Sequence, residues 1–163
     1  MKIRSKILFL LTTLLIVSIT SCVKKVDYPI EPIIKFEEFK RFNNDSAWFI
    51  FSFTDGDGDI GFRKGDTIAP FLGDYAYNFY MDYYEKQNGE FVKNELIPPF
   101  FYRIPDVTPD GKNKSIEGEV IVRMKFYFDP SSANDTIKYS AFIYDRSHNK
   151  SNIIETQEII VVK

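Results

Sequence analysis

Three aspartates on alternate positions are the residues of this chain best suited to bind a metal ion. Asp55, Asp57 and Asp59 are separated by Gly56 and Gly58, directly after an apolar segment. Calcium binds about six to eight hard oxygen atoms at 2.3–2.6 Å, and a glycine-rich turn can direct alternate carboxylates to one point. Carboxylates this close also repel one another unless a cation neutralises them. The loop is therefore predicted to bind calcium, although aspartate and glycine also form plain hairpin turns.

Residues 55–66 resemble the calcium loop of EF-hand and dockerin proteins. The ligand positions 1, 3, 5, 7 and 12 of that loop fall here on Asp55, Asp57, Asp59, the carbonyl of Gly61, and Asp66. The resemblance implies that Gly61 and Asp66 complete the ligand set. Two features depart from that family: Ile60 stands where it has glycine, and the flanks are expected to be strands rather than helices. Magnesium is the weaker alternative, because it prefers one or two carboxylates and retained waters.

The composition excludes several other kinds of site. The chain of 163 residues contains one cysteine and one histidine, so neither an intrachain disulfide nor a Cys/His zinc site can form. A catalytic triad would have to use His148, which lies in a polar turn and is expected to be exposed. The formal charge of −2 offers no basic face for nucleic acid, so no nucleic-acid partner is expected.

The N-terminus carries the pattern of an export signal. Lys2, Arg4 and Lys6 precede an apolar run over residues 7–19, which as a helix spans about 20 Å and is too short for the roughly 30 Å hydrocarbon core. Ile19-Thr20-Ser21-Cys22 then resembles the bacterial lipobox, in which the cysteine is lipidated and becomes the new N-terminus. We therefore predict a lipoprotein signal peptide over residues 1–21, with the lipidated Cys22 and a tether over residues 22–32.

The resemblance to a lipoprotein also indicates where the protein resides. Val23 follows the cysteine, whereas aspartate at this position retains enterobacterial lipoproteins in the inner membrane, so the outer membrane is expected. Acidic residues do not follow Cys22 directly, as they do in many surface-exported lipoproteins of Bacteroidota, so the periplasmic side is favoured over the cell surface. The segment 55–61, with sequence DGDGDIG, resembles a signature of Bacteroidota lipoproteins whose function is not characterised.

The remainder of the chain is predicted to form strands, because apolar and polar residues alternate with a period of two in segment after segment. Val120, Val122, Met124, Phe126 and Phe128 share one face, and Arg123 and Lys125 lie on the other. Asn88-Gly89 predicts a type I′ hairpin turn. The expected strands cover residues 33–42, 47–54, 75–85, 90–93, 100–104, 119–128, 136–144 and 153–162.

Antiparallel strands without helices favour an all-β, two-sheet sandwich over residues 33–163, with a small closed β-barrel as the alternative. Residues 141–152 resemble the closing hairpin of immunoglobulin-like and fibronectin-type-III-like modules. In such a sandwich the loop after the second strand and the loop between the last two strands lie at the same end. Asp145, together with the Asn149 side-chain carbonyl, is therefore expected to approach the acidic loop and complete an exposed, weak calcium site.

Two classes of function follow from the sequence. The first is a non-enzymatic envelope module that binds a protein or glycan partner and is stabilised by calcium. The second is a glycan-binding or glycan-processing protein, with Asp57 paired to Asp82 or Glu85 as catalytic carboxylates in the processing case. The sequence also matches the Asp-Ser/Thr-apolar motif of Bacteroidota O-glycosylation at three hydroxyl residues, Ser46, Thr67 and Thr136.

Overall fold

The structure is a computed structural model that describes residues 27–43, 45–108 and 115–162. The predicted signal peptide and Cys22 lie outside the described residues. Among the residues that are described, no helix is long and apolar enough to cross a membrane.

The first sheet contains three antiparallel strands in the order β1-β2-β6. Its strands are β1 (Ile33–Arg41), β2 (Ser46–Asp55) and β6 (Ile116–Lys125). The central strand β2 carries the sequence SAWFIFSFTD, and because the side-chain period is two, Phe49, Phe51 and Phe53 face the second sheet and Trp48 lies on the opposite face.

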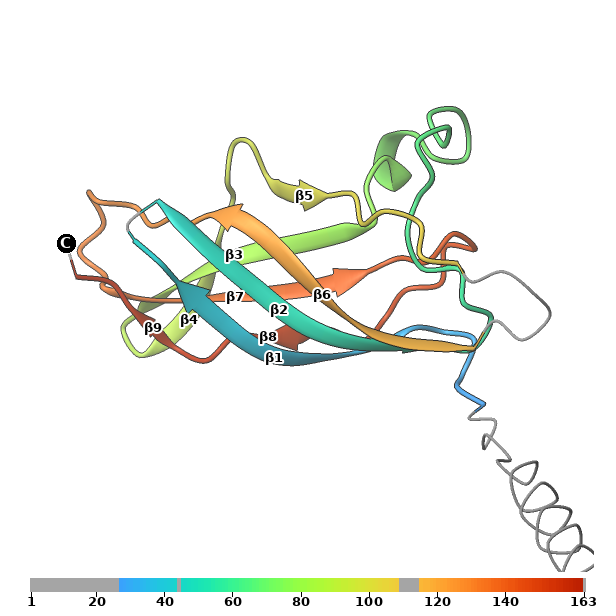
Figure 1. The fold of residues 1–163 in the computed structure, drawn as a ribbon. Coiled ribbons are helices and arrows are strands. Elements are labelled where there is room, and N and C mark those ends of the chain that lie inside the picture. Colours follow the sequence, from blue (N-terminus) through green and yellow to red (C-terminus); the bar gives the residue numbers. More distant parts are fainter. Residues whose placement is uncertain (1–26, 44, 109–114, 163) are drawn as a thin grey trace, which may run out of the picture.

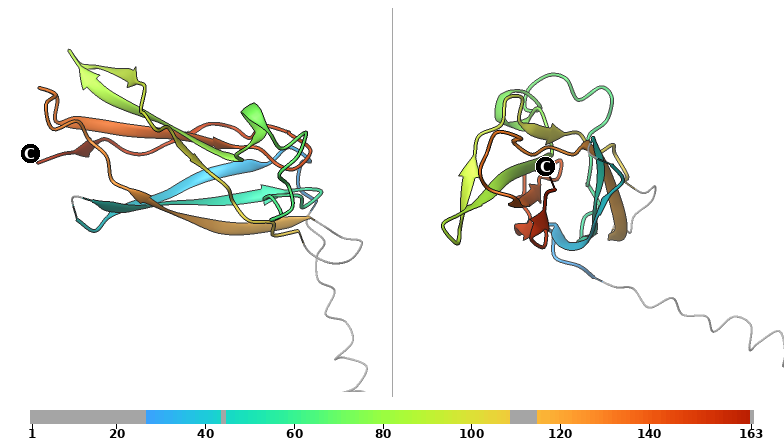
Figure 2. Two further views of the ribbon diagram at one scale, coloured as in Figure 1. Left: turned by 90° about the horizontal axis from the view of Figure 1, so that it is seen from above. Right: turned by 90° about the vertical axis from the view of Figure 1, so that its left-hand side faces the viewer.

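The second sheet has six strands in the order β4-β3-β7-β8, with β5 also paired to β3 and β9 to β7. Its strands are β3 (Phe79–Gln87), β4 (Glu90–Asn94), β5 (Phe100–Tyr102), β7 (Thr136–Ile143), β8 (Ile154–Glu155) and β9 (Ile159–Ile160). Figure 2 shows the two sheets as separate facing layers, so the predicted sandwich is confirmed and the alternative of a closed barrel is wrong.

The pairing can be compared with that of immunoglobulin-like sandwiches. Strands β1, β2 and β6 pair in the same order as strands A, B and E of such a sandwich, and strands β3, β7 and β8 in the same order as its strands C, F and G. As a result, the β2–β3 and β7–β8 connections lie at the same end of the molecule, together with the N-terminal segment (Figure 1).

The core between the sheets is built from aromatic rings. Phe49 and Phe51 of β2 are fully buried and lie 5.9 and 5.7 Å from the ring of Phe79 on β3. On β7, the hydroxyl of the buried Tyr139 donates a hydrogen bond to the Tyr127 carbonyl at 2.6 Å. Rings of this size bury large apolar areas, which explains how the domain folds without a disulfide.

The predicted register of β6 is confirmed. Met124 and Phe126 are each 5% exposed, whereas Arg123 and Lys125 are exposed on the opposite face. The strand covers Ile116–Lys125 instead of the expected residues 119–128, so it begins and ends three residues earlier, and Gly118 continues the pairing with β2 opposite Phe53. A Cβ at Gly118 would lie 3.0 Å from the Phe53 ring, so the glycine here accommodates a neighbour rather than ending the strand.

Two other strand predictions need correction. Residue Tyr75 belongs to the 3-10 turn η1 (Gly73–Tyr75), and β3 begins only at Phe79. The single strand expected over residues 153–162 is divided into β8 and β9, because the Thr156 side chain replaces a backbone partner and accepts the Tyr139 N–H. The Asn88-Gly89 turn is confirmed, with positive φ values of 53° and 90° as a type I′ turn requires.

Candidate metal centre

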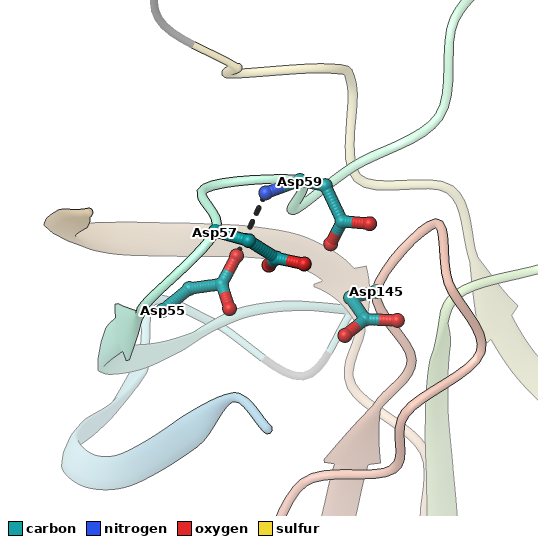
Figure 3. Close-up of side chains that lie close together, drawn as sticks. All are labelled: Asp55, Asp57, Asp59 and Asp145. Atoms are coloured by element: carbon teal, nitrogen blue, oxygen red, sulfur yellow. Dashed lines mark hydrogen bonds between the residues drawn. The ribbon is translucent and has the colours of Figure 1, made fainter. Parts of the chain in front are cut away.

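Four aspartates from two distant loops meet at one end of the sandwich. Asp55 ends β2, Asp57 and Asp59 follow in the next turn, and Asp145 comes two residues after β7 (Figure 3). Each offers a carboxylate oxygen, and these atoms lie within 4.8 Å of one another. The structure thus brings Asp145 to the acidic loop, as the sandwich topology predicted.

Backbone and hydroxyl groups hold the acidic loop in shape. The Asp59 N–H donates to Asp55 Oδ2 at 2.8 Å, the bond drawn in Figure 3, and this closes the turn. Asp59 is also tied to the second loop, because its carbonyl accepts the Arg146 N–H at 3.1 Å and its Oδ2 accepts the Ser147 hydroxyl at 2.7 Å. The two loops are therefore connected directly.

The Asp145 carboxylate is oriented by Asn149. Its Oδ1 accepts the Asn149 backbone N–H at 2.7 Å, and its Oδ2 accepts the Asn149 side-chain amide at 2.8 Å. The amide donates to Asp145, so Asn149 supports a carboxylate instead of presenting its carbonyl to the group. The turn between them requires a left-handed residue, which is His148 with φ of 65°.

Burial makes the carboxylates of Asp55 and Asp145 costly to ionise. Asp55 and Asp145 have no exposed surface, so the expectation of an exposed site is wrong for these two residues. The pKa of Asp55 is raised to about 7, mainly by burial and in smaller part by the charges of Asp57, Asp59 and Asp145, against the lowering effect of the hydrogen bond from the Asp59 N–H. Burial likewise raises the pKa of Asp145 to about 6, opposed by the bonds from Asn149.

The buried oxygens leave positions for a cation. Asp55 Oδ1 and Asp59 Oδ1 are both buried without a hydrogen-bond partner among the described residues. Within the same part of the chain, no lysine or arginine forms an ion pair with Asp55, Asp59 or Asp145. Two oxygens on opposite sides of one metal ion lie about 4.6–5.2 Å apart when each bond is 2.3–2.6 Å. The spacing of the four carboxylates can therefore hold a single metal ion.

Asp66 does not join this group. Its carboxylate forms an ion pair with Arg146 and accepts the Arg63 N–H at 2.7 Å, and these bonds outweigh burial and lower its pKa. The chain turns away from the metal centre before reaching Asp66, because the Phe62 N–H bonds to the Ile104 carbonyl at 2.8 Å. The EF-hand-like spacing therefore does not bring its twelfth position to the site.

Gly61 has a clear structural role. Its φ is +92°, and a Cβ there would lie 2.0 Å from the Pro105 carbonyl oxygen, so only glycine fits against this neighbouring segment. That its carbonyl binds the metal remains a prediction.

His148 is partly buried, so the expectation of an exposed side chain is wrong. Its ring stacks on Tyr75 with centroids 4.1 Å apart and also contacts Phe71 edge-on at 5.8 Å. The sequence pattern predicted a strand that includes Tyr75, so the contact between Tyr75 and His148 was not expected.

The carboxylate pairs considered for glycan hydrolysis are not brought together. Asp82 pairs with Ser140 and Glu85 with Ile137, five and eight residues before Asp145 on β7. At about 3.3 Å per residue, these positions lie roughly 16 and 26 Å from the metal centre. Catalytic carboxylates of glycosidases are about 5–9.5 Å apart. Instead, Asp82 forms an ion pair with Lys93, and Glu85 accepts hydrogen bonds from Tyr83 and Ser132.

The hydroxyl residues of the three O-glycosylation motifs differ in accessibility. Thr67 is exposed in the loop before η1. Ser46 and Thr136 are partly buried at strand ends, where their hydroxyls donate to Asn43 and Asp135. Thr67 is therefore the most accessible of the predicted acceptors.

Comparison of the chain with protein-family models, with curated proteins and with solved structures found no match.

Proposed function

We propose that this chain is a lipid-anchored protein of the bacterial outer membrane whose immunoglobulin-like domain binds one calcium ion and acts as a non-enzymatic interaction module. The observation that carries the metal part is the group of four carboxylates, two of them fully buried, with oxygens left without partners. Burying charges without a counter-ion is expensive, and a divalent cation removes that cost.

Calcium fits this group better than magnesium does. Four carboxylates provide many hard oxygens, and calcium accepts such oxygens in varied geometries, whereas magnesium favours fewer carboxylates with retained waters. A high charge count and loops already connected to one another favour tighter binding than the sequence suggested, with Kd of about 10⁻⁵ M or below. At a hundred times Kd the ion would add about 2.7 kcal/mol to the free energy of unfolding.

The anchor part of the proposal rests on the sequence Ile19-Thr20-Ser21-Cys22 and its position after the apolar run. A single acyl chain binds membranes weakly, but the two or three chains of a bacterial lipoprotein hold a protein stably. The outer membrane and the periplasmic side follow from Val23 and from the absence of acidic residues directly after Cys22.

Calorimetric melting tests the metal part. The transition temperature of the protein should rise when calcium replaces chelator, and the rise should be lost in Asp57→Asn and Asp145→Asn but kept in Asp82→Asn. Asp82 is a matched control, because its carboxylate lies along β3 and pairs with Lys93. An equal rise in all four proteins would assign calcium to another place.

A glycan partner is a second candidate function, favoured by a hollow on the outer face of the second sheet. The hollow encloses about 460 Å³ and is lined mainly by aromatic side chains, namely Tyr77, Tyr80, Phe101, Phe142 and Tyr144. Aromatic rings of this kind offer apolar surface with polar edges. Binding of envelope glycans, measured by calorimetry, should be lost in Tyr77→Ala if this hollow is the site and retained if it is not.

A further inference from the structure

The N-terminal segment, residues 27–34, includes the first two residues of β1 and packs directly against the acidic loop. The Gly56 N–H donates to the Pro29 carbonyl at 2.7 Å. A Cβ on Gly56 would lie 2.3 Å from the Tyr28 carbonyl oxygen and 2.6 Å from that of Pro29, both of them backbone atoms. Gly56, which lies between Asp55 and Asp57, is therefore also the residue against which this segment packs; we call this contact the seat of the segment.

The second loop holds the same part of the chain. The Asn152 side chain accepts the Ile34 N–H and donates to the Ile34 carbonyl, both at 2.8 Å. Asn152 follows Asp145 in the connection to β8. A further bond runs from the Tyr28 N–H to the Ser115 hydroxyl at 3.3 Å, next to the start of β6. Both loops that carry the four carboxylates thus fix the beginning of the domain.

The chain between this seat and the proposed anchor is short. Cys22 precedes Asp27 by five residues, which reach at most about 18 Å when fully extended. The 10 residues of β2 alone measure about 33 Å, and β2 leads from the seat to the opposite end of the sandwich. The end that holds the four aspartates is therefore the one nearest the lipid.

We propose that metal binding and the seating of residues 27–34 are coupled, and that together they hold the metal-carrying end of the sandwich against the phospholipid headgroups of the anchoring membrane. This inference rests on the proposed calcium site and lipid anchor. A metal ion that draws the acidic loop and the Asp145 loop together also aligns Gly56 and Asn152. These are the two residues whose hydrogen bonds hold the segment. By linkage, loosening the segment must weaken metal binding by the same factor. The ion also neutralises carboxylates that would otherwise repel anionic headgroups.

The test uses the mature lipidated protein in vesicles of phosphatidylethanolamine and phosphatidylglycerol, with calcium affinity measured by titration. Gly56→Ala should raise the calcium Kd at least about five-fold, because its methyl group displaces the segment without altering a carboxylate. Gly65→Ala is the matched control, since a Cβ there meets nothing within 4 Å. Asn152→Ala releases the segment from the other loop and should weaken calcium binding in the same direction.

Orientation is measured on the same samples by energy transfer from a labelled cysteine to acceptors in the headgroup layer. Cys22 is the only cysteine and is consumed by the lipid, so Lys150→Cys and Glu90→Cys can each be labelled alone. With calcium, transfer should be strong from position 150 at the metal-carrying end and weak from position 90 in the far hairpin, and chelator should reduce the difference.

The outcomes separate this inference from the function on which it rests. Absence of calcium binding in the unaltered protein, or its release from vesicles, would refute the proposed function and this inference with it. Calcium binding by an anchored protein, but with equal affinity in Gly56→Ala, Asn152→Ala and Gly65→Ala or equal transfer from both labels, would overturn the inference alone.

Discussion

Replacing Asp55 by asparagine should stabilise the metal-free domain and at the same time abolish its stabilisation by calcium. Asparagine keeps an oxygen that can accept the Asp59 N–H, the bond that closes the acidic loop at 2.8 Å. Its amide group then stands where the carboxylate had a buried oxygen without a partner, and it can donate to the neighbouring carboxylates. The substitution therefore removes a buried charge while the fold of the loop is kept.

The size of the effect follows from the pKa of Asp55. The difference between about 7 in the folded chain and the ordinary value of 3.8 corresponds to roughly 4 kcal/mol of unfavourable free energy once the group is ionised above pH 7. For a chain of 163 residues, this amounts to a rise in transition temperature on the order of 10 °C in Asp55→Asn at pH 8 with chelator. In calcium the difference between the two transition temperatures should become smaller or change sign, because only the unaltered protein gains free energy from calcium binding.

The assay is calorimetric melting at pH 8, with chelator and with calcium, for the unaltered protein and Asp55→Asn. Asp66→Asn serves as the control, since Asp66 pairs with Arg146 outside the four-carboxylate group and should respond to calcium as the unaltered protein does. A metal-free Asp55→Asn that melts well below the unaltered protein would refute the reasoning, because the carboxylate would then be stabilising without a metal.

Three further predictions concern the anchor, the core and the response to pH. Cys22→Ser should leave unprocessed or soluble precursor in detergent partitioning, whereas a mutant that still enters the detergent phase at the mature size would contradict lipidation. Phe126→Ala should cost about 3–5 kcal/mol in urea unfolding and Lys125→Ala within about 0.5, so equal losses would disprove the register of β6. With chelator, the free energy of unfolding should fall as pH rises from about 4 to 7, because the raised pKa values of Asp55 and Asp145 make the folded chain bind more protons there; a rise over this interval would argue against their burial as ionisable groups.

The fold was predictable because its signals are local and repeated. Alternation along residues 119–128 placed Met124 and Phe126 inside, and Asn88-Gly89 specified a turn that needs two positive φ values. The meeting of Asp145 with the acidic loop also followed, since strand order alone determines which loops share an end of a sandwich. These inferences required no knowledge of individual side-chain contacts.

The remaining features depend on contacts that spacing does not encode. Asp66 has the right position in the twelve-residue count. It nevertheless forms an ion pair with Arg146, the residue that follows Asp145 in the chain. His148 stacks on Tyr75 because residues 73–75 form a 3-10 turn, which an aromatic-rich alternating pattern concealed. The seat of the N-terminal segment on Gly56 depends on a close backbone approach, and a glycine in an acidic loop has an equally good local explanation as a turn former.

Anomalous diffraction from crystals grown with calcium shows most directly whether one calcium ion joins the two loops. We expect a single peak among the carboxylates of Asp55, Asp57, Asp59 and Asp145, with oxygens at about 2.3–2.6 Å and Asp66 still paired with Arg146. A peak elsewhere, or no peak while the four carboxylates keep their positions, would contradict this expectation.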